Sequence, residues 1–433
     1  MKNETTDRMM EFIRKSPTCF HTVNNLRENL IKEGFEELSE KQKWNLKSGN
    51  KYFVIRNDSS IISFVLPESD YDRFLITAAH SDSPSFKVKD NPDMYNIGIY
   101  RLNIEKYGGM LMNPWFDRAL SIAGRVVVLK KEGNSTSIKS VLINIDKDLL
   151  VIPSLAIHMN RDANDGHKID VQNEMLPVIS SSPDFKLKSI IAKECGVTED
   201  EIKGYDLFLY NRDEPKYFGE ADEFILSPRL DDLECAFTTS AAFIDASKEN
   251  KGTKLLVNAI FDNEEVGSQS LQGAASTFLY DVLKRISISM NHDEDRFYRE
   301  LAASFMISAD NAHAVHPNYT SSADPVNRPE LNKGPVIKYN ASQKYTTDSL
   351  SGGLFKSICE ENNIPYQIYT NNSNVPGGST LGNISMSQVS VRSVDIGLAQ
   401  WAMHSPTESA GSKDPELMLK AIKAFYKSDI YIE

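Results

Sequence analysis

Short apolar runs and helical patterns alternate along most of the chain. Residues 5–34 carry apolar side chains at the spacing of a helix face, and Pro17 interrupts that pattern. From there to residue 90 the pattern predicts short strands at KYFVIR, SIISFVL and RFLITAA. Beyond residue 225, helices predicted over about 231–248, 273–287 and 348–362 alternate with the apolar strands LLVNAIF, FMISA, YQIYT and SVDIGL.

The stretch between these two regions has a different pattern. It contains the strand-like runs GRVVVLKK, SVLINI and YDLFLY, separated by polar loops such as EGNSTS and MNRDANDGHK. Alternating helices and apolar strands are typical of an α/β sheet with helices on both faces. The sequence therefore predicts a doubly wound, mixed α/β domain formed by residues 1–91 and 223–433, interrupted by an inserted β-rich domain at 92–222.

Composition narrows the class of protein and its partners. The chain has 433 residues, of which 40% are hydrophobic, and a net charge of −12. This acidic balance argues against nucleic acid or an anionic membrane as the main partner. The four cysteines are far apart and typical of reduced thiols, and the sequence shows neither a signal peptide nor an apolar run of membrane-spanning length. We expect a cytoplasmic protein.

The strand LLVNAIF ends abruptly in the acidic sequence Asp262-Asn263-Glu264-Glu265. Like charges at the edge of a core repel one another, and they persist most easily when a cation or a shared proton takes up the charge. A solvated acidic turn is the simpler alternative for this stretch taken alone.

Other predicted strands also end in residues that can bind a metal. RFLITAA ends at His80, FMISA ends at Asp310, and SVDIGL is followed closely by His404, while Asp231 opens the helix after Ser227-Pro228-Arg229-Leu230. Each residue alone has an ordinary explanation, such as a helix cap or a turn. Their joint occurrence at strand ends indicates a site, because sites in open α/β sheets form outside the carboxyl ends of the strands.

This set of imidazole and carboxylate ligands suits zinc, manganese or cobalt and contains no thiolate. Five ligands are too many for one catalytic zinc, but they suit two ions about 3.5–4 Å apart that share a carboxylate. Asp82, two residues beyond His80, can orient its imidazole. One of the adjacent glutamates can bind a metal while the other acts as a base, and the spacing leaves open which does which.

Seven stretches match a known family in its own order. They are AAHSDSPSFKVK (78–89), IPSLAIHMNR (152–161), SPRLDDL (227–233), FDNEEVGS (261–268), SADNAHAVHPNY (308–319), NKGPVIKYNASQKYTT (332–347) and LAQWAMHSPTE (398–408). Together they resemble the M18 metallopeptidase family, of the aspartyl aminopeptidase type. The resemblance implies two zinc-type ions: His80 and Asp310 bind one, Glu265 and His404 bind the other, and Asp231 bridges them.

The resemblance also implies roles outside the metal ligands. Glu264 is the general base, and His158 reaches the active site of a neighbouring subunit. His313, Lys338 and Tyr345 match positions that contact substrate. Without the resemblance, Lys338 would be interpreted as a solvated strand lysine.

Two features do not follow from the pattern. SPRLDDL carries a second acid, Asp232, and the segment 371–383 contains a Pro-Gly-Gly run to which the sequence assigns no role.

The resemblance thus predicts a cytoplasmic aminopeptidase that releases one N-terminal residue, an acidic one, from peptides. It also implies a tetrahedral dodecamer in which the inserted domain makes the subunit contacts. A broad or neutral specificity, and a related two-metal deacylase or carboxypeptidase, are alternatives. SPRLDDL and GPVIKYN favour the aminopeptidase. A non-catalytic binding protein would need a lost base or ligand, and none is missing.

Overall fold

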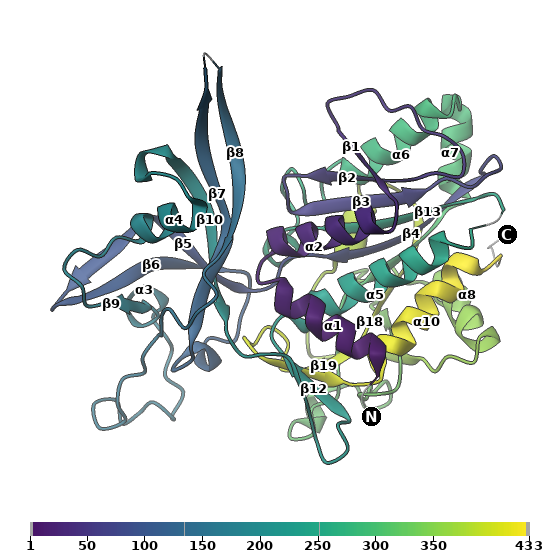
Figure 1. The fold of residues 1–433 in the computed structure, drawn as a ribbon. Coiled ribbons are helices and arrows are strands. Elements are labelled where there is room, and N and C mark those ends of the chain that lie inside the picture. Colours follow the sequence, from purple (N-terminus) through teal and green to yellow (C-terminus); the bar gives the residue numbers. More distant parts are fainter. Residues whose placement is uncertain (1–2, 134, 251, 430–433) are drawn as a thin grey trace. The chain divides into compact units, whose positions relative to one another are not determined.

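The computed structural model describes residues 3–133, 135–250 and 252–429, and the chain divides into two compact units (Figure 1). The first unit comprises Met1–Asp82, Pro215–Met403 and Glu408–Glu433, and the second comprises Ser83–Glu214 and His404–Thr407. The borders between the units at 82/83 and 214/215 therefore lie earlier in the chain than those expected from the sequence, at 91/92 and 222/223.

The difference has a structural cause at each border. Strand β5, Ser85–Asn96, already pairs within the sheet of the second unit. Strand β11, Lys216–Phe218, already pairs with a strand of the first unit.

A mixed sheet forms the centre of the first unit. Within the described residues it has nine strands in the order β1-β2-β3-β13-β4-β14-β18-β16-β17. Their bounds are β1 Glu36–Leu38, β2 Lys51–Arg56, β3 Ser60–Val65, β4 Arg73–His80, β13 Lys254–Phe261, β14 Phe305–Ala309, β16 Val336–Tyr339, β17 Gln367–Thr370 and β18 Arg392–Gly397. Strands β13, β4, β14 and β18 are parallel, whereas β3 and β16 pair antiparallel to their central neighbours. The carboxyl ends of the four parallel strands therefore meet at one edge.

Helices cover both faces of this sheet, which confirms the predicted α/β fold class. Strand β13 is buried along its whole length, as expected of a strand covered on both sides. Leu256 and Ile260 point into one hydrophobic cluster, and Val257 and Phe261 into the other. The first cluster includes side chains of α2 Cys19–Lys32, α5 Leu230–Ser247, α8 Ser349–Glu361 and α10 Asp414–Lys427, and the second those of α6 Phe278–Ser289, α7 Glu294–Ala302 and α9 Leu381–Ser385.

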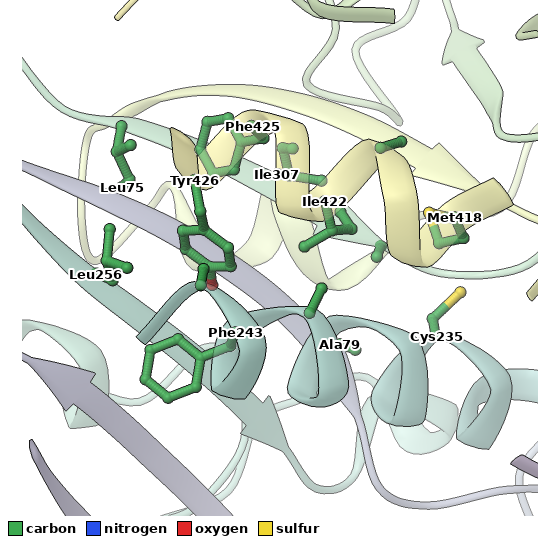
Figure 2. Close-up of a cluster of buried hydrophobic side chains, with 14 of the residues drawn as sticks. Leu75, Ala79, Cys235, Phe243, Leu256, Ile307, Met418, Ile422, Phe425 and Tyr426 are labelled. Carbon is green, nitrogen blue, oxygen red and sulfur yellow. The ribbon is translucent and has the colours of Figure 1, made fainter. Parts of the chain in front are cut away.

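Helices α5 and α10 lie side by side over the first face. Figure 2 shows Phe243 of α5 close to Tyr426 of α10, and their rings are 5.9 Å apart between centroids. Helix α1, Glu4–Lys15, contributes Met9 and Ile13 to a further cluster with residues of α5. Helix α5 is buried almost throughout, and this fixes the position of its first turn, where Asp231 lies.

Several predicted elements are found with shifted ends. The interrupted pattern over 5–34 forms α1 and α2, and the patterns over 231–248 and 348–362 form α5 and α8. Helix α6 begins at Phe278, later than the predicted 273, because the chain before it turns tightly. A Cβ at Gly273 would lie 2.2 Å from the carbonyl oxygen of Ser268. The pattern did not predict α7 or α10.

The first unit also carries a smaller sheet, ordered β11-β12-β20-β19-β15 in the described part of the chain. The bounds of its other strands are β12 Phe224–Ser227, β15 Ala312–His313, β19 Ala399–Trp401 and β20 Glu408–Gly411. Among the described residues, no helix is long and apolar enough to span a membrane.

The second unit is built on an antiparallel sheet ordered β8-β7-β10-β5-β6-β9. The bounds of its other strands are β6 Ile99–Tyr107, β7 Leu120–Glu132, β8 Ser135–Asn144, β9 Val178–Ser180 and β10 Ile202–Asn211. The sequence did not predict its helices, α3 Val171–Glu174 and α4 Leu187–Cys195. The unit has its own core, in which Phe86 and Trp115 pack edge to face.

Candidate metal centre

His80 is the last residue of β4, and its side chain is almost completely buried. Its Nδ1 lies 3.1 Å from the carbonyl oxygen of Asp82 and 3.3 Å from the Oδ1 of the same residue. Its Nε2 lies 3.3 Å from Oδ1 of Asp231. When Nδ1–H of His80 donates to Asp82, the lone pair of Nε2 faces the side of Asp231. This is the arrangement of a metal-binding imidazole.

Asp82 also determines where the two adjacent glutamates lie. Its two carboxylate oxygens accept hydrogen bonds from the backbone amides of Glu264 and Glu265, each at 3.2 Å. These amides open the short 3-10 helix η3, Glu264–Val266, which follows strand β13. One buried aspartate therefore connects the ends of two neighbouring strands, and it orients both the imidazole and the acidic turn.

The first turn of α5 supplies two more buried carboxylates, Asp231 and Asp232. The backbone amide of Asp231 donates to Oε2 of Glu408 at 3.1 Å. The backbone amide of His80 donates to Oδ2 of Asp232 at 3.0 Å. The second acid of SPRLDDL, which had no role in the sequence analysis, thus holds the end of the strand that carries His80.

The structure brings all four predicted ligands of the first unit together. His80, Asp231, Asp232 and Asp310 each place one possible ligand atom within 4.8 Å of the others. His80, Glu264 and Glu265 form a second such group, and Asp231 and Glu265 also come within 4.8 Å of each other. Asp231 is therefore near both Asp310 and Glu265, where a shared ligand would have to be.

The electrostatics of these carboxylates favours bound cations. Burial raises the pKa of Glu265 well above its ordinary value, and the Asp231 carboxylate raises it further. Burial likewise raises the pKa of Asp310, although Lys338 opposes the shift. Divalent ions would relieve both the loss of hydration and the mutual repulsion. Together with a donor set of imidazole and carboxylate, this means that the residues fit zinc-type ions.

Lys338 and Tyr345 lie beside this cluster. Lys338, on strand β16, is buried, so its interpretation as a solvated lysine is wrong. Its Nζ is 3.7 Å from Oδ2 of Asp310 and 5.5 Å from the centre of the Tyr345 ring. Burial would lower the pKa of Lys338, but Asp310 and other nearby groups raise it above its ordinary value. A protonated amine is therefore held next to a predicted metal ligand.

Tyr369 connects the predicted substrate contacts, although the sequence analysis did not identify it. Its ring centre is 6.3 Å from that of Tyr345 and 6.1 Å from that of His313. His313 is exposed at the end of β15. Tyr369 lies on β17, which pairs with the strand of Lys338, and only this pairing in the folded chain could have identified it.

The two remaining predicted histidines belong to the second unit. His404 lies in the segment His404–Thr407, and its carbonyl accepts a hydrogen bond from the backbone amide of Leu111 at 3.0 Å. His158 is exposed in a turn at 157–159. Their predicted contributions to the site stay predictions.

A buried polar network extends from Asp231 and was also missed. Nε2 of Gln400 donates a hydrogen bond to Oε1 of Glu408 at 3.4 Å. The side-chain amide of Asn311 donates to both Gln400 and Glu234. Glu408 and Asn311 occur in the quoted motifs, so their position was a usable signal. Nothing in their residue types distinguished them from ordinary polar loop residues.

Buried imidazole and carboxylate groups gather where parallel strands of an α/β sheet end, and this arrangement is typical of a metal-dependent enzyme. Residues 12–426 match the family model described as Aminopeptidase I zinc metalloprotease (M18). The chain belongs to the M18 family of zinc aminopeptidases, as the resemblance implied.

Relatives and solved structures agree with this family. Two proteins named "Probable M18 family aminopeptidase 2", from Clostridium novyi (strain NT) and Clostridium acetobutylicum, are 46% and 45% identical, and each match covers 98% of this chain and 100% of the relative. A structure of the Ape4 and Nbr1 complex aligns with a TM-score of 0.92 at 36% identity, over 98% of this chain and 85% of the other. The mApe1 dodecamer of S. cerevisiae aligns with a TM-score of 0.86 at 27% identity, over 98% and 96%.

Proposed function

We propose that this M18 aminopeptidase holds two divalent ions, preferably zinc with manganese or cobalt as alternatives, and releases one acidic N-terminal residue from peptides. The observation that carries the proposal is the place of Asp231, whose carboxylate is near both Asp310 and Glu265. In this account His80 and Asp310 hold one ion, Glu265 and His404 hold the other, and Asp231 bridges them.

Glu264 acts as the general base. Such ions, when bound, polarise a peptide carbonyl and make water more acidic. Burial raises the pKa of Glu264 to about 8, with His80 opposing the shift and Asp310 adding to it. Asp82 holds the backbone of Glu264 in place. The Glu264 carboxylate can then take a proton from the attacking water and pass it to the leaving amine.

Lys338 is the group that we expect to recognise an acidic first residue. The net charge of −12 gives no long-range attraction for acidic peptides, so selectivity has to be local. A buried ammonium next to Asp310 can pair with a substrate carboxylate at short range. The rival is that Lys338 binds the peptide backbone while the pocket accepts neutral residues.

Lys338→Met is expected to lower kcat/KM for Asp and Glu substrates by about 10- to 100-fold, the size expected for a lost charged hydrogen bond. Values for Leu and Met substrates should change little. Lys344→Met removes the same charge from an exposed position and is the matched control. A wild-type enzyme that already prefers leucine would contradict acidic specificity but not the two-metal site. Metal content must be measured in each variant, because Lys338 contacts a predicted ligand.

We also propose a homo-oligomer, specifically a tetrahedral dodecamer, in which the second unit makes the subunit contacts. The dodecamer described for mApe1 supports it. So does the loop around His158, where the apolar side chains of Leu155, Ile157 and Met159 are exposed. The cytoplasmic location stays a prediction.

His158 is expected to complete the site of a neighbouring subunit. Glu264→Gln and His158→Ala chains should each be inactive alone. After subunits are exchanged between them at equal amounts, about a quarter of all sites would combine an intact Glu264 with an intact His158. Activity should then recover towards that fraction. Recovery near zero in confirmed mixed oligomers would show that His158 serves its own chain.

A further inference from the structure

We propose that Asn211 and Arg118 of the second unit are positioning residues for His404, acting through the segment His404–Thr407. The inference rests on the proposed role of His404 as a metal ligand.

The far end of this segment is held by two side chains. Asn211, the last residue of β10, is buried, and its Nδ2 donates to the Pro406 carbonyl at 3.0 Å and to Oγ1 of Thr407 at 2.8 Å. Nη1 of Arg118 donates to the same hydroxyl at 2.9 Å. Arg118 is itself fixed by an ion pair with Asp213. The Thr407 hydroxyl is therefore the point where both contacts meet.

The near end is held at His404 itself. The backbone amide of Leu111 donates to its carbonyl, and the residue has a φ of 66°. A residue other than glycine keeps such a left-handed conformation only where surrounding contacts hold it. Contacts at Leu111 and at Thr407 thus hold both ends of a four-residue segment and fix the backbone from which the imidazole projects.

The contacts at the far end rest on a rigid support. Asn211 is paired in register with Leu120 at the start of β7, and Arg118 lies two residues before that strand. The segment is thereby attached to the antiparallel sheet that forms the core of the second unit. Groups that orient a metal ligand typically change metal affinity by 10- to 100-fold when they are removed.

Thr407→Val tests the inference, because valine keeps the shape of threonine and removes the hydroxyl. Thr407→Ser is the matched control, since it keeps the hydroxyl. His404→Ala identifies the zinc equivalent that depends on His404. The readouts are zinc affinity of the full-length chain, from competition with a chelator, and the thermal midpoint of the metal-free protein. Neither depends on catalysis.

In Thr407→Val, we expect the zinc equivalent that His404→Ala loses to bind about 10- to 100-fold more weakly, with the other equivalent unchanged. Thr407→Ser should remain close to wild type. Arg118→Lys keeps a positive charge near Asp213 but loses the planar guanidinium, so it should weaken binding of the same zinc equivalent. This variant replaces Thr407→Val in the test if the valine variant fails to fold.

Unchanged zinc affinity in the folded Thr407→Val or Arg118→Lys protein, alongside a lost equivalent in His404→Ala, would overturn this inference alone. If His404→Ala keeps all its zinc, the ligand role proposed for His404 is wrong, and the inference fails with it. The two failures are therefore distinguishable.

Discussion

Replacing Glu264 with glutamine is expected to reduce kcat by about a hundredfold or more, the usual size of a general-base effect, and to leave the metal content unchanged. Glutamine has nearly the same size as glutamate, and its backbone amide can still donate a hydrogen bond to Asp82. The acidic turn should therefore remain in place. It cannot take a proton from water. Turnover on aminoacyl-anilide substrates and elemental analysis of the same preparation measure the two quantities.

Glu265→Gln is the matched control, because it makes the same change at the adjacent residue. It should instead weaken metal binding, since Glu265 lies within 4.8 Å of both His80 and Asp231. If the two phenotypes are exchanged, so that Glu264→Gln loses metal and Glu265→Gln keeps it, the roles given to the two glutamates are reversed.

Asp231→Asn is expected to lose both ions and about a thousandfold or more of kcat/KM. In the proposed site the Asp231 carboxylate would offer one anionic oxygen to each ion, whereas an amide would offer one neutral oxygen. Ions bound in this way would supply several kcal/mol of transition-state stabilisation, and each 1.36 kcal/mol corresponds to a factor of about ten in rate. Metal content after dialysis and kcat/KM report the effect.

Asp232→Asn is the control for this substitution. Asp232 is adjacent to Asp231 and is also buried. Its Oδ2 accepts a hydrogen bond from the backbone amide of His80, and the side-chain oxygen of asparagine can accept the same bond. We therefore expect it to keep most of its metal. Loss of metal from Asp232→Asn and its retention in Asp231→Asn would mean that Asp232, not Asp231, is the shared ligand.

The gathering of three predicted ligands, His80, Glu265 and Asp310, could be predicted from the sequence because it follows from one rule about sheets. His80 ends strand β4, Asp310 follows the parallel neighbour β14, and the acidic turn of Glu264 and Glu265 follows β13 on the other side of β4. Parallel strands deliver their carboxyl ends to the same edge, so residues far apart in the chain had to meet. The apolar runs alone were enough to predict this.

The supporting residues could not be predicted in this way. The role of Asp232 depends on the approach of its carboxylate to the backbone of His80, 152 positions earlier in the chain. Glu408 reaches Asp231 through strand β20 of the small sheet, which the apolar pattern did not reveal. Such contacts depend on how whole elements pack, and residue type alone carries no signal of them.

The borders between the two units show a related limit. Periodicity describes the strand that a segment forms but not the sheet to which that strand belongs. Strand β5 therefore looked continuous with the strands before it, although it pairs with β6 and β10. His404 likewise follows a strand of the first unit in the sequence, yet it belongs to the second unit, where its carbonyl accepts a hydrogen bond from the backbone amide of Leu111.

Metal content and metal dependence, measured together on the purified full-length protein, test the central claim most directly. After mild dialysis, elemental analysis should find close to two equivalents of divalent ion per chain. Release of aminoacyl groups should stop on chelation and return when zinc, manganese or cobalt is added back. A single equivalent of metal, with activity that chelation does not affect, would contradict the two-metal account.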